Sequence, residues 1–185
     1  MRARLCFVSA ILLLAGCVAY VHDEKVDRLK PAPVQLSQFA GTYVDEASYH
    51  TPPNKMGLMG HTTLGGAIRS LQFGANVLIE VDSSGNISVS APGSKYNPGV
   101  IYYAKGKDFD FVDHRIVFKS EGRFGSHDSP GIGGYKKQMQ WMLDEAGRLV
   151  VVSSSKGGGL VGVIPVAVGG STLGIFDRTK GLTSR

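Results

Sequence analysis

The sequence predicts an all-β protein, either a small antiparallel meander barrel of about eight or nine strands or a β-sandwich. A length of 185 residues favours one domain, and the shares of hydrophobic residues (43%) and charged residues (19%) exclude a disordered chain. The chain holds 25 glycines, and each glycine inside a helix costs roughly 1 kcal/mol relative to alanine, which disfavours long helices. The chain also contains short segments, bounded by turn residues, in which apolar and polar residues alternate. This alternation is typical of strands.

The clearest strands form a hairpin. Val77 and Ile79 share one face of the first strand, Ile87 and Val89 share one face of the second, and a turn-rich stretch at 82–86 joins them. Further strands are expected, in chain order, at 42–45, 100–104, 109–118, 138–144, 149–152, 161–168 and 173–176. The glycine-rich stretches 157–162 and 169–171 are expected to be turns or bulges, and no segment after residue 37 shows a helical period.

The N-terminal residues carry an export signal. Arg2 and Arg4 precede an apolar stretch at 5–14, and small residues follow it in the sequence Leu14-Ala15-Gly16-Cys17. This stretch resembles the lipobox of bacterial lipoproteins. The resemblance implies cleavage between Gly16 and Cys17, acylation of Cys17, and a place in the outer membrane, on its periplasmic side. The alternative is a plain membrane anchor, because residues 5–21 are all uncharged.

These observations divide the chain into four parts. Residues 1–16 are the predicted lipoprotein signal peptide, 17–38 a lipid-anchored tether, 39–178 the β-barrel domain, and 179–185 a polar tail. The tether has a mixed composition that includes charged residues, and Pro31 and Pro33 prevent the continuation of any helix. Fully extended at ~3.3 Å per residue, the eighteen residues from Val18 to Gln35 would let the domain stand roughly 60 Å from the membrane.

The start of the domain resembles the entry of lipocalin-like (calycin) β-barrels. A short helical turn at 36–39 is expected to lead into the first strand, and Gly41 and Tyr43 match the spacing of the glycine and the aromatic residue that plug the closed end of such barrels. The chain departs from that pattern because Tyr43 replaces the usual tryptophan. Arg178 is a loose counterpart of the usual arginine after the last strand.

No motif in the sequence specifies a reaction. The stretch 157–162 matches G-x-G-x-x-G, but no helix is expected to follow it, so it is not predicted to bind a dinucleotide. Ser126, His127 and Asp128 are adjacent, and adjacent side chains on extended backbone point apart, so they do not form a triad. Asp110, Asp113 and His114 are interpreted as a solvated turn rather than a metal site, and the histidines form no H-x-H or H-E-x-x-H pair. We therefore predict no catalytic residue, no metal and no cofactor.

The segment 49–70 is long for a loop in a compact domain, and such loops are often functional. We expect it to form a lid across the barrel mouth and to contact a ligand. The candidate ligand-binding residues are Met56, Leu58, Met59 and Leu64, since methionine suits a surface that adapts to varied apolar ligands. The alternative is that these apolar side chains cap the core.

The sequence thus predicts a lipid-anchored envelope protein that acts as a binding or accessory module with an apolar cavity. The expected partners are the membrane, through the N-terminal lipid, and a small apolar ligand or an envelope protein. No nucleic-acid partner is expected. The formal charge of +5 falls to +3 when Arg2 and Arg4 leave with the signal, and this mild basicity suits contact with anionic surfaces. The alternatives are a structural protein that docks an envelope assembly, and a hydrolase whose site carries no recognisable motif.

Overall fold

The computed structural model describes residues 17–53, 61–69, 76–92, 94, 99–124, 131–161 and 164–179. The strands are β1 (Cys17–His22), β2 (Gly41–Tyr43), β3 (Tyr49–His50), β4 (Val77–Val81), β5 (Ile87–Ser90), β6 (Ile101–Tyr103), β7 (Phe109–Val112), β8 (Arg115–Phe118), β9 (Glu121–Phe124), β10 (Gly131–Leu143), β11 (Leu149–Val161) and β12 (Ile164–Phe176). The helices are α2 (Glu24–Arg28), the 3-10 turn η1 (Leu36–Phe39) and α3 (Leu64–Arg69). The all-β class is therefore confirmed. None of the helices in the described ranges is long and apolar enough to span a bilayer.

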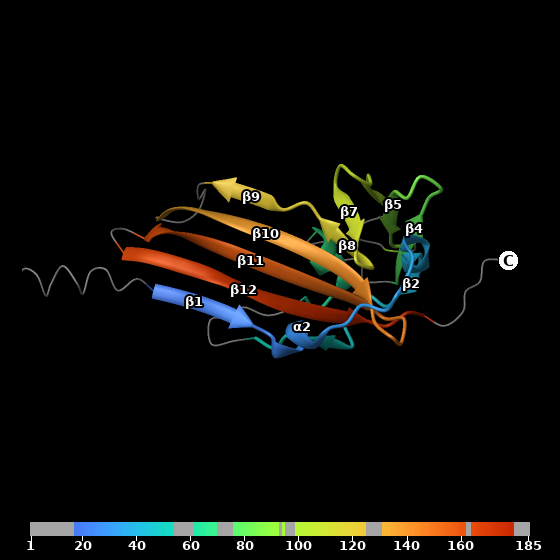
Figure 1. Ribbon diagram of the computed structural model, residues 1–185, viewed down its shortest axis with the longest axis horizontal. Coiled ribbons are helices and arrows are strands. Elements are labelled where there is room, and N and C mark those ends of the chain that lie inside the picture. The colour runs from blue at the N-terminus through green and yellow to red at the C-terminus, as the bar shows by residue number, and fades with distance from the viewer. Residues whose placement is uncertain are drawn as a thin grey trace, which may run out of the picture.

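The strands form two sheets and not one closed barrel (Figure 1). The smaller sheet has the strand order β2-β4-β5-β6, and the larger has the order β1-β12-β11-β10-β8-β7, with β3 beside β12 and β9 beside β10. Every pair is antiparallel except β1 with β12, which run parallel. Meander connections dominate, as the sequence predicts.

The two sheets are joined where β2 meets the chain after β12. The amide of Val44 donates to the carbonyl of Asp177 over 2.9 Å, and the amide of Thr179 donates to the carbonyl of Thr42 over 2.9 Å. A bridge between Tyr43 and Arg178 lies between these two hydrogen bonds. One edge of the small sheet therefore continues into the large sheet.

One hydrophobic core fills the space between the sheets. Trp141 of β10 is fully buried and lies at its centre, with ring centroids 4.8 Å from Phe118 and 6.3 Å from Tyr103. The hairpin β4–β5 points its alternate residues, Val77 and Ile79 among them, into this core, as its sequence pattern predicts. The opposite face of the large sheet carries a smaller buried cluster built on Met142, Val150, Val152 and Leu173.

The three longest strands correct two predicted turns. β10, β11 and β12 have 13 residues each, and Figure 1 shows them side by side, extending well beyond β4 and β5. Gly157 lies inside β11 opposite Tyr135, and the stretch 169–171 lies inside β12. Glycine is suited to this place because the strands approach closely: a Cβ on Gly133 would lie 2.6 Å from the carbonyl oxygen of Gly158.

A short helix, α3, replaces part of the loop expected at 49–70. Its first turn is fixed by hydrogen bonds to side chains: the amide of Gly65 donates to Asp45 Oδ1 over 2.8 Å, and the amide of Gly66 donates to Thr63 Oγ1 over 3.0 Å. Leu64 is fully buried in the core between the sheets. Only six residues long, α3 is too short for its period to stand out in the sequence.

The segment between Cys17 and Leu29 lies against the large sheet. β1 pairs with β12, and α2 packs Val26 and Leu29 on the smaller buried cluster. Asp23, which is buried, caps α2 by accepting from the amide of Lys25 over 2.9 Å. It also accepts from the hydroxyls of Tyr49 (2.9 Å) and Thr51 (2.8 Å). These contacts dock much of the segment that the sequence led us to expect as a tether; the four domain boundaries stay predictions.

We expect Asp23→Ala to release this segment, at a cost of about 1–3 kcal/mol, because it removes a helix cap and hydrogen bonds to a carboxylate. Trypsin should then cut faster after Lys25 and Arg28. The exposed Asp27→Asn, in the same helix, is the control: its side-chain oxygen can still accept from Nε2 of His22, so cleavage should not change and stability should change by no more than about 0.5 kcal/mol. Equal cleavage rates in the two variants would contradict the docking role of Asp23.

The same carboxylate sets a pH dependence. Burial raises the pKa of Asp23, but the hydrogen bonds from Lys25, Thr51 and Tyr49 and the charge of Lys25 outweigh burial, so the pKa lies below its ordinary value of 3.8. The stability that Asp23 supplies is therefore complete above pH 3.8 and is lost as the pH falls through the lower folded-state pKa.

Candidate functional site

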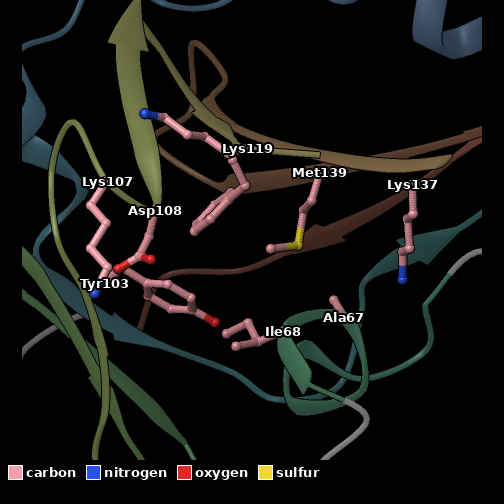
Figure 2. Close-up of a pocket in the computed structure, with 9 residues that line it drawn as sticks. Ala67, Ile68, Tyr103, Lys107, Asp108, Lys119, Lys137 and Met139 are labelled. Carbon is pink, nitrogen blue, oxygen red and sulfur yellow. The ribbon is translucent and has the colours of Figure 1, made fainter. Parts of the chain in front are cut away.

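A cavity of about 270 Å³ lies between α3 and the inner face of the large sheet. Figure 2 shows Ile68, Tyr103 and Met139 converging on this space, with Lys137 on one side of it and Lys107 and Asp108 on the other. The apolar wall consists of Ala67, Ile68, Tyr103, Phe118 and Met139, and the polar rim of Lys107, Asp108, Lys119 and Lys137. We call this space the lysine-rimmed cavity.

The alternation of β10 explains why a lysine lies beside core residues. Met139, Trp141 and Leu143 point to the inner face of the sheet, where Trp141 and Leu143 are buried in the main core. Because strand residues two apart share a face, Lys137 lies on the same inner face. It occupies the point where β10 leaves the core, and is half-buried there.

A tight turn between β6 and β7 holds the opposite rim. Gly106 has a φ of +80°, a left-handed conformation that glycine adopts without strain, and its amide donates to the carbonyl of Phe109 over 2.7 Å. The carboxylate of Asp108 accepts from the amide of Ala104 over 2.8 Å. The ammonium of Lys119 donates to the carbonyl of Gly106. The turn therefore fixes Lys107 and Asp108 beside Tyr103.

Charge and size define what the lysine-rimmed cavity can hold. Three lysines and one aspartate line it; the carboxylate of Asp108 already accepts a backbone hydrogen bond, and the ammonium of Lys119 donates to the carbonyl of Gly106 and points away from the cavity in Figure 2. The volume lies just below the range of about 300–1,000 Å³ that is typical of small-molecule pockets. The arrangement suits a short ligand with an apolar body and an anionic head.

A serine–histidine pair lies near Lys137. Nε2 of His61 is 3.2 Å from Oγ of Ser153, which faces Met139 across the β10–β11 ladder and is buried. Burial, with a smaller contribution from the charge of Lys137, lowers the pKa of His61 to about 4. An imidazole with this pKa is neutral at pH 7 but is a weak general base, because an efficient base has a pKa near the working pH. The pair therefore fits a structural hydrogen bond better than an activated nucleophile.

This pKa predicts that the free energy of unfolding decreases in mildly acidic solution. Between pH 6.5 and about 4 the unfolded state binds a proton on His61 that the folded state does not, so stability falls as the pH drops through this window. His61→Gln should flatten the dependence of the urea midpoint on pH between 6.5 and 4. Ser155→Ala, a change at an exposed residue without a titratable side chain, is the control and should keep the slope of the unmodified protein. An unchanged slope in His61→Gln would show that His61 is not the group responsible.

The residues predicted as a lid are only partly within the described ranges. Met56, Leu58 and Met59 lie outside the described residues. Leu64 is fully buried in the main core, and the helix that it begins supplies Ala67 and Ile68 to the wall of the lysine-rimmed cavity. The lid itself stays a prediction. Cys17 begins β1, while Gly16 lies outside the described residues.

The three residues at the predicted barrel entry lie together. η1 precedes Gly41, the ring of Tyr43 is fully buried, and its hydroxyl donates to the carbonyl of Phe39 over 3.0 Å. The guanidinium of Arg178 lies 5.8 Å from the Tyr43 ring centroid and donates to the carbonyl of Ala40. A Cβ on Gly41 would lie 2.5 Å from that guanidinium, so the glycine leaves room for it. This contact closes the core where the two sheets join.

The other candidate side chains do not form a site. Ser126, His127 and Asp128 lie outside the described residues. Asp113 and His114 adopt positive φ values in the β7–β8 turn, and Nδ1 of His114 lies 2.9 Å from the carbonyl oxygen of Val34. In the described parts of the chain, no three histidine, cysteine, aspartate or glutamate side chains gather in a group able to hold a metal ion.

The lysines of the cavity rim are absent from the residues singled out by the sequence. One signal was available: extending the alternation of Met139 and Trp141 back by one step places Lys137 on the inner face. Lys107 and Lys119 carried no such signal. Lys107 lies in the β6–β7 turn and Lys119 follows β8, and both come near α3 only in the folded chain. Comparison with protein-family models, with curated proteins and with solved structures yielded no match for this chain.

Proposed function

We propose that this chain is a lipid-anchored envelope protein whose β domain binds a small amphipathic anion. The lysine-rimmed cavity carries the proposal, because apolar side chains form its wall and the side chains of Lys107 and Lys137 stand on its two sides. A fatty acid, an alkyl phosphate or a similar molecule combines the two features that such a cavity recognises. The lipobox sequence Leu14-Ala15-Gly16-Cys17 supports an anchor in the outer membrane, with the domain in the periplasm.

The finer architecture that we propose is a partly open barrel. The backbone hydrogen bonds of Val44 and Thr179 link the small sheet to the large one at one seam. At the other side, the short turn at 104–108 connects β6, an edge of the small sheet, directly to β7, an edge of the large sheet, and these two strands do not form a ladder. The lysine-rimmed cavity lies near this connection, since Tyr103, Lys107 and Asp108 border it. An opening at this place would give a ligand access.

Binding of octanoate tests the proposal. We expect octanoate to bind to the protein held in lipid nanodiscs, and Lys137→Gln to weaken binding about tenfold, because a charge-assisted hydrogen bond contributes roughly 1.5–3 kcal/mol. Isothermal titration calorimetry, with empty nanodiscs as the blank, provides the measurement. Lys30→Gln is the control: it removes the same charge from an exposed residue that does not line the cavity, and it should leave octanoate binding unchanged.

The uncharged probe 1-octanol separates an amphipathic site from a merely apolar one. It should bind more weakly than octanoate to the unmodified protein and equally well to Lys137→Gln. If 1-octanol binds as tightly as octanoate, or if Lys137→Gln leaves octanoate binding unchanged, the anion site is wrong. The predicted structural docking protein would then be the better reading of this domain.

A further inference from the structure

We propose that the outer end of the long sheet rests on an anionic membrane surface beside Cys17. This arm end consists of four strand segments: 17–19 of β1, 131–135 of β10, 157–161 of β11 and 164–168 of β12. The inference rests on the proposed lipid anchor, and it adds a second membrane contact made by the folded domain. The occupant to which we commit is the surface of the bilayer that holds the acyl chains.

The arm end carries no charged residue in any of these four segments. Their residues are glycines and apolar residues, with Tyr135 and Cys17. Of the six positions whose exposure is defined, Gly158 and Ala167 are exposed and the other four, all glycines, are half-buried. Uncharged strands at an exposed end of a sheet are unusual in water, where natural proteins protect such strands with charges.

A row of interfacial side chains crosses the sheet where the arm end begins. Tyr20 lies opposite Gly169, Gly169 opposite Lys156, and Lys156 opposite Lys136, so the three side chains share one face of four adjacent strands. Tyr20 is 64% exposed, and both lysines are exposed. Tyrosine and lysine are the residue types that gather at the headgroup level of membranes.

The two lysines also indicate the sign of the partner. Lys136 and Lys156 face each other directly across the β10–β11 ladder, and like charges in that position destabilise a pair of strands. An anion placed between them removes the repulsion. Phosphate headgroups supply such anions across a whole surface, and each lysine near an anionic leaflet adds to the attraction.

The position of Cys17 brings the membrane to the same place. Cys17 is the first residue of β1 and pairs with Val166, inside the arm end. Figure 1 shows β1 (blue) along β12 (orange-red) in the half of the sheet away from β4 and β5. Acyl chains attached to Cys17 would therefore enter the bilayer next to the uncharged strands.

Backbone hydrogen bonding limits how deep the arm end goes. β9 pairs with β10 only at 134–137, and β1 pairs with β12 only at 166–171. In the described part of the sheet, the outer edge of β10 at 131–133 and that of β12 at 164–165 therefore have no neighbouring strand. An open sheet edge does not occur in the hydrocarbon region, so the arm end lies in the hydrated headgroup zone.

Fluorescence of the variant Tyr20→Trp tests this contact. The chain has one tryptophan, Trp141, which is fully buried, so the unmodified protein supplies the reference spectrum. The acylated variant is placed in phosphatidylcholine vesicles with and without phosphatidylglycerol, using lipids brominated near the headgroup. We expect the new emission to be blue-shifted and quenched in the anionic vesicles. In that background Lys136→Gln/Lys156→Gln should remove about half of the quenching or more, and the exposed pair Lys30→Gln/Lys105→Gln should leave it unchanged.

The outcomes separate this inference from the proposed anchor. An acylated protein whose new tryptophan is not quenched in anionic vesicles overturns the membrane contact and leaves the anchor standing. Equal quenching in the variant pairs overturns the role of the lysine row. An intact mass without fatty acid overturns the anchor; added anionic vesicles then still decide the contact, because quenching supports it and an unchanged spectrum overturns it.

Discussion

Replacing Cys17 by serine is expected to abolish lipid attachment completely. The thiol is the group that would carry the diacylglyceryl chains, and a serine hydroxyl at the same position does not form the thioether. We expect cells grown with labelled palmitate to incorporate label into the unmodified protein and none into Cys17→Ser, and the variant to keep residues 1–16. Intact mass and membrane fractionation of the two proteins measure both effects.

Cys6→Ser provides the matched control, since it removes the other cysteine of the chain from within the predicted signal peptide. Its label, mass and fractionation should equal those of the unmodified protein. If Cys17→Ser is processed and fractionates normally, the lipoprotein reading is wrong. If instead the unmodified protein carries no label and keeps residues 1–16, the uncharged stretch at 5–21 would be a plain anchor.

Local sequence patterns predicted those parts of the fold whose strands are close in the chain. The β4–β5 hairpin alternates cleanly and is joined by a short turn, so neighbours in sequence determine its pairing. The outer halves of β10, β11 and β12 could not be predicted in this way. Glycine has a low intrinsic preference for strands. At Gly133 and Gly158 glycine is suitable because the strands β10 and β11 approach closely, and this close approach arises only in the folded chain.

The candidate site was predictable only in part for the same reason. Lys137 follows from the alternation of β10, whereas α3 and the β6–β7 turn meet β10 only in the folded chain. Leu64 was singled out because its apolar side chain stood in a long loop, and the capping side chains of Thr63 and Asp45 turn that loop into the helix that buries it. The contact of Arg178 with Tyr43 spans most of the domain, so spacing alone could only suggest it.

Trp141 is a fully buried residue of the core between the two sheets, next to the lysine-rimmed cavity. Its ring contacts Phe118 and Tyr103, two residues that also line the lysine-rimmed cavity. Trp141→Ala should lower the free energy of unfolding by about 3–5 kcal/mol, because truncation of a buried tryptophan leaves a large void. A domain of this size is typically stable by about 5–15 kcal/mol, so the variant should lose a large share of its stability. Urea unfolding followed by circular dichroism measures the loss.

Two further substitutions show whether this loss comes from packing. The indole N–H of Trp141 is buried and has no hydrogen-bond partner in the described structure, so Trp141→Phe removes an unpaired donor while keeping an aromatic ring. We expect it to cost less than half as much as Trp141→Ala. Tyr102, on the same strand as Tyr103 but 72% exposed, gives the surface control, and Tyr102→Ala should change stability by no more than about 0.5 kcal/mol. Should Trp141→Ala cost no more than Tyr102→Ala, the sheets would not share one core, and the cavity wall would have no common support.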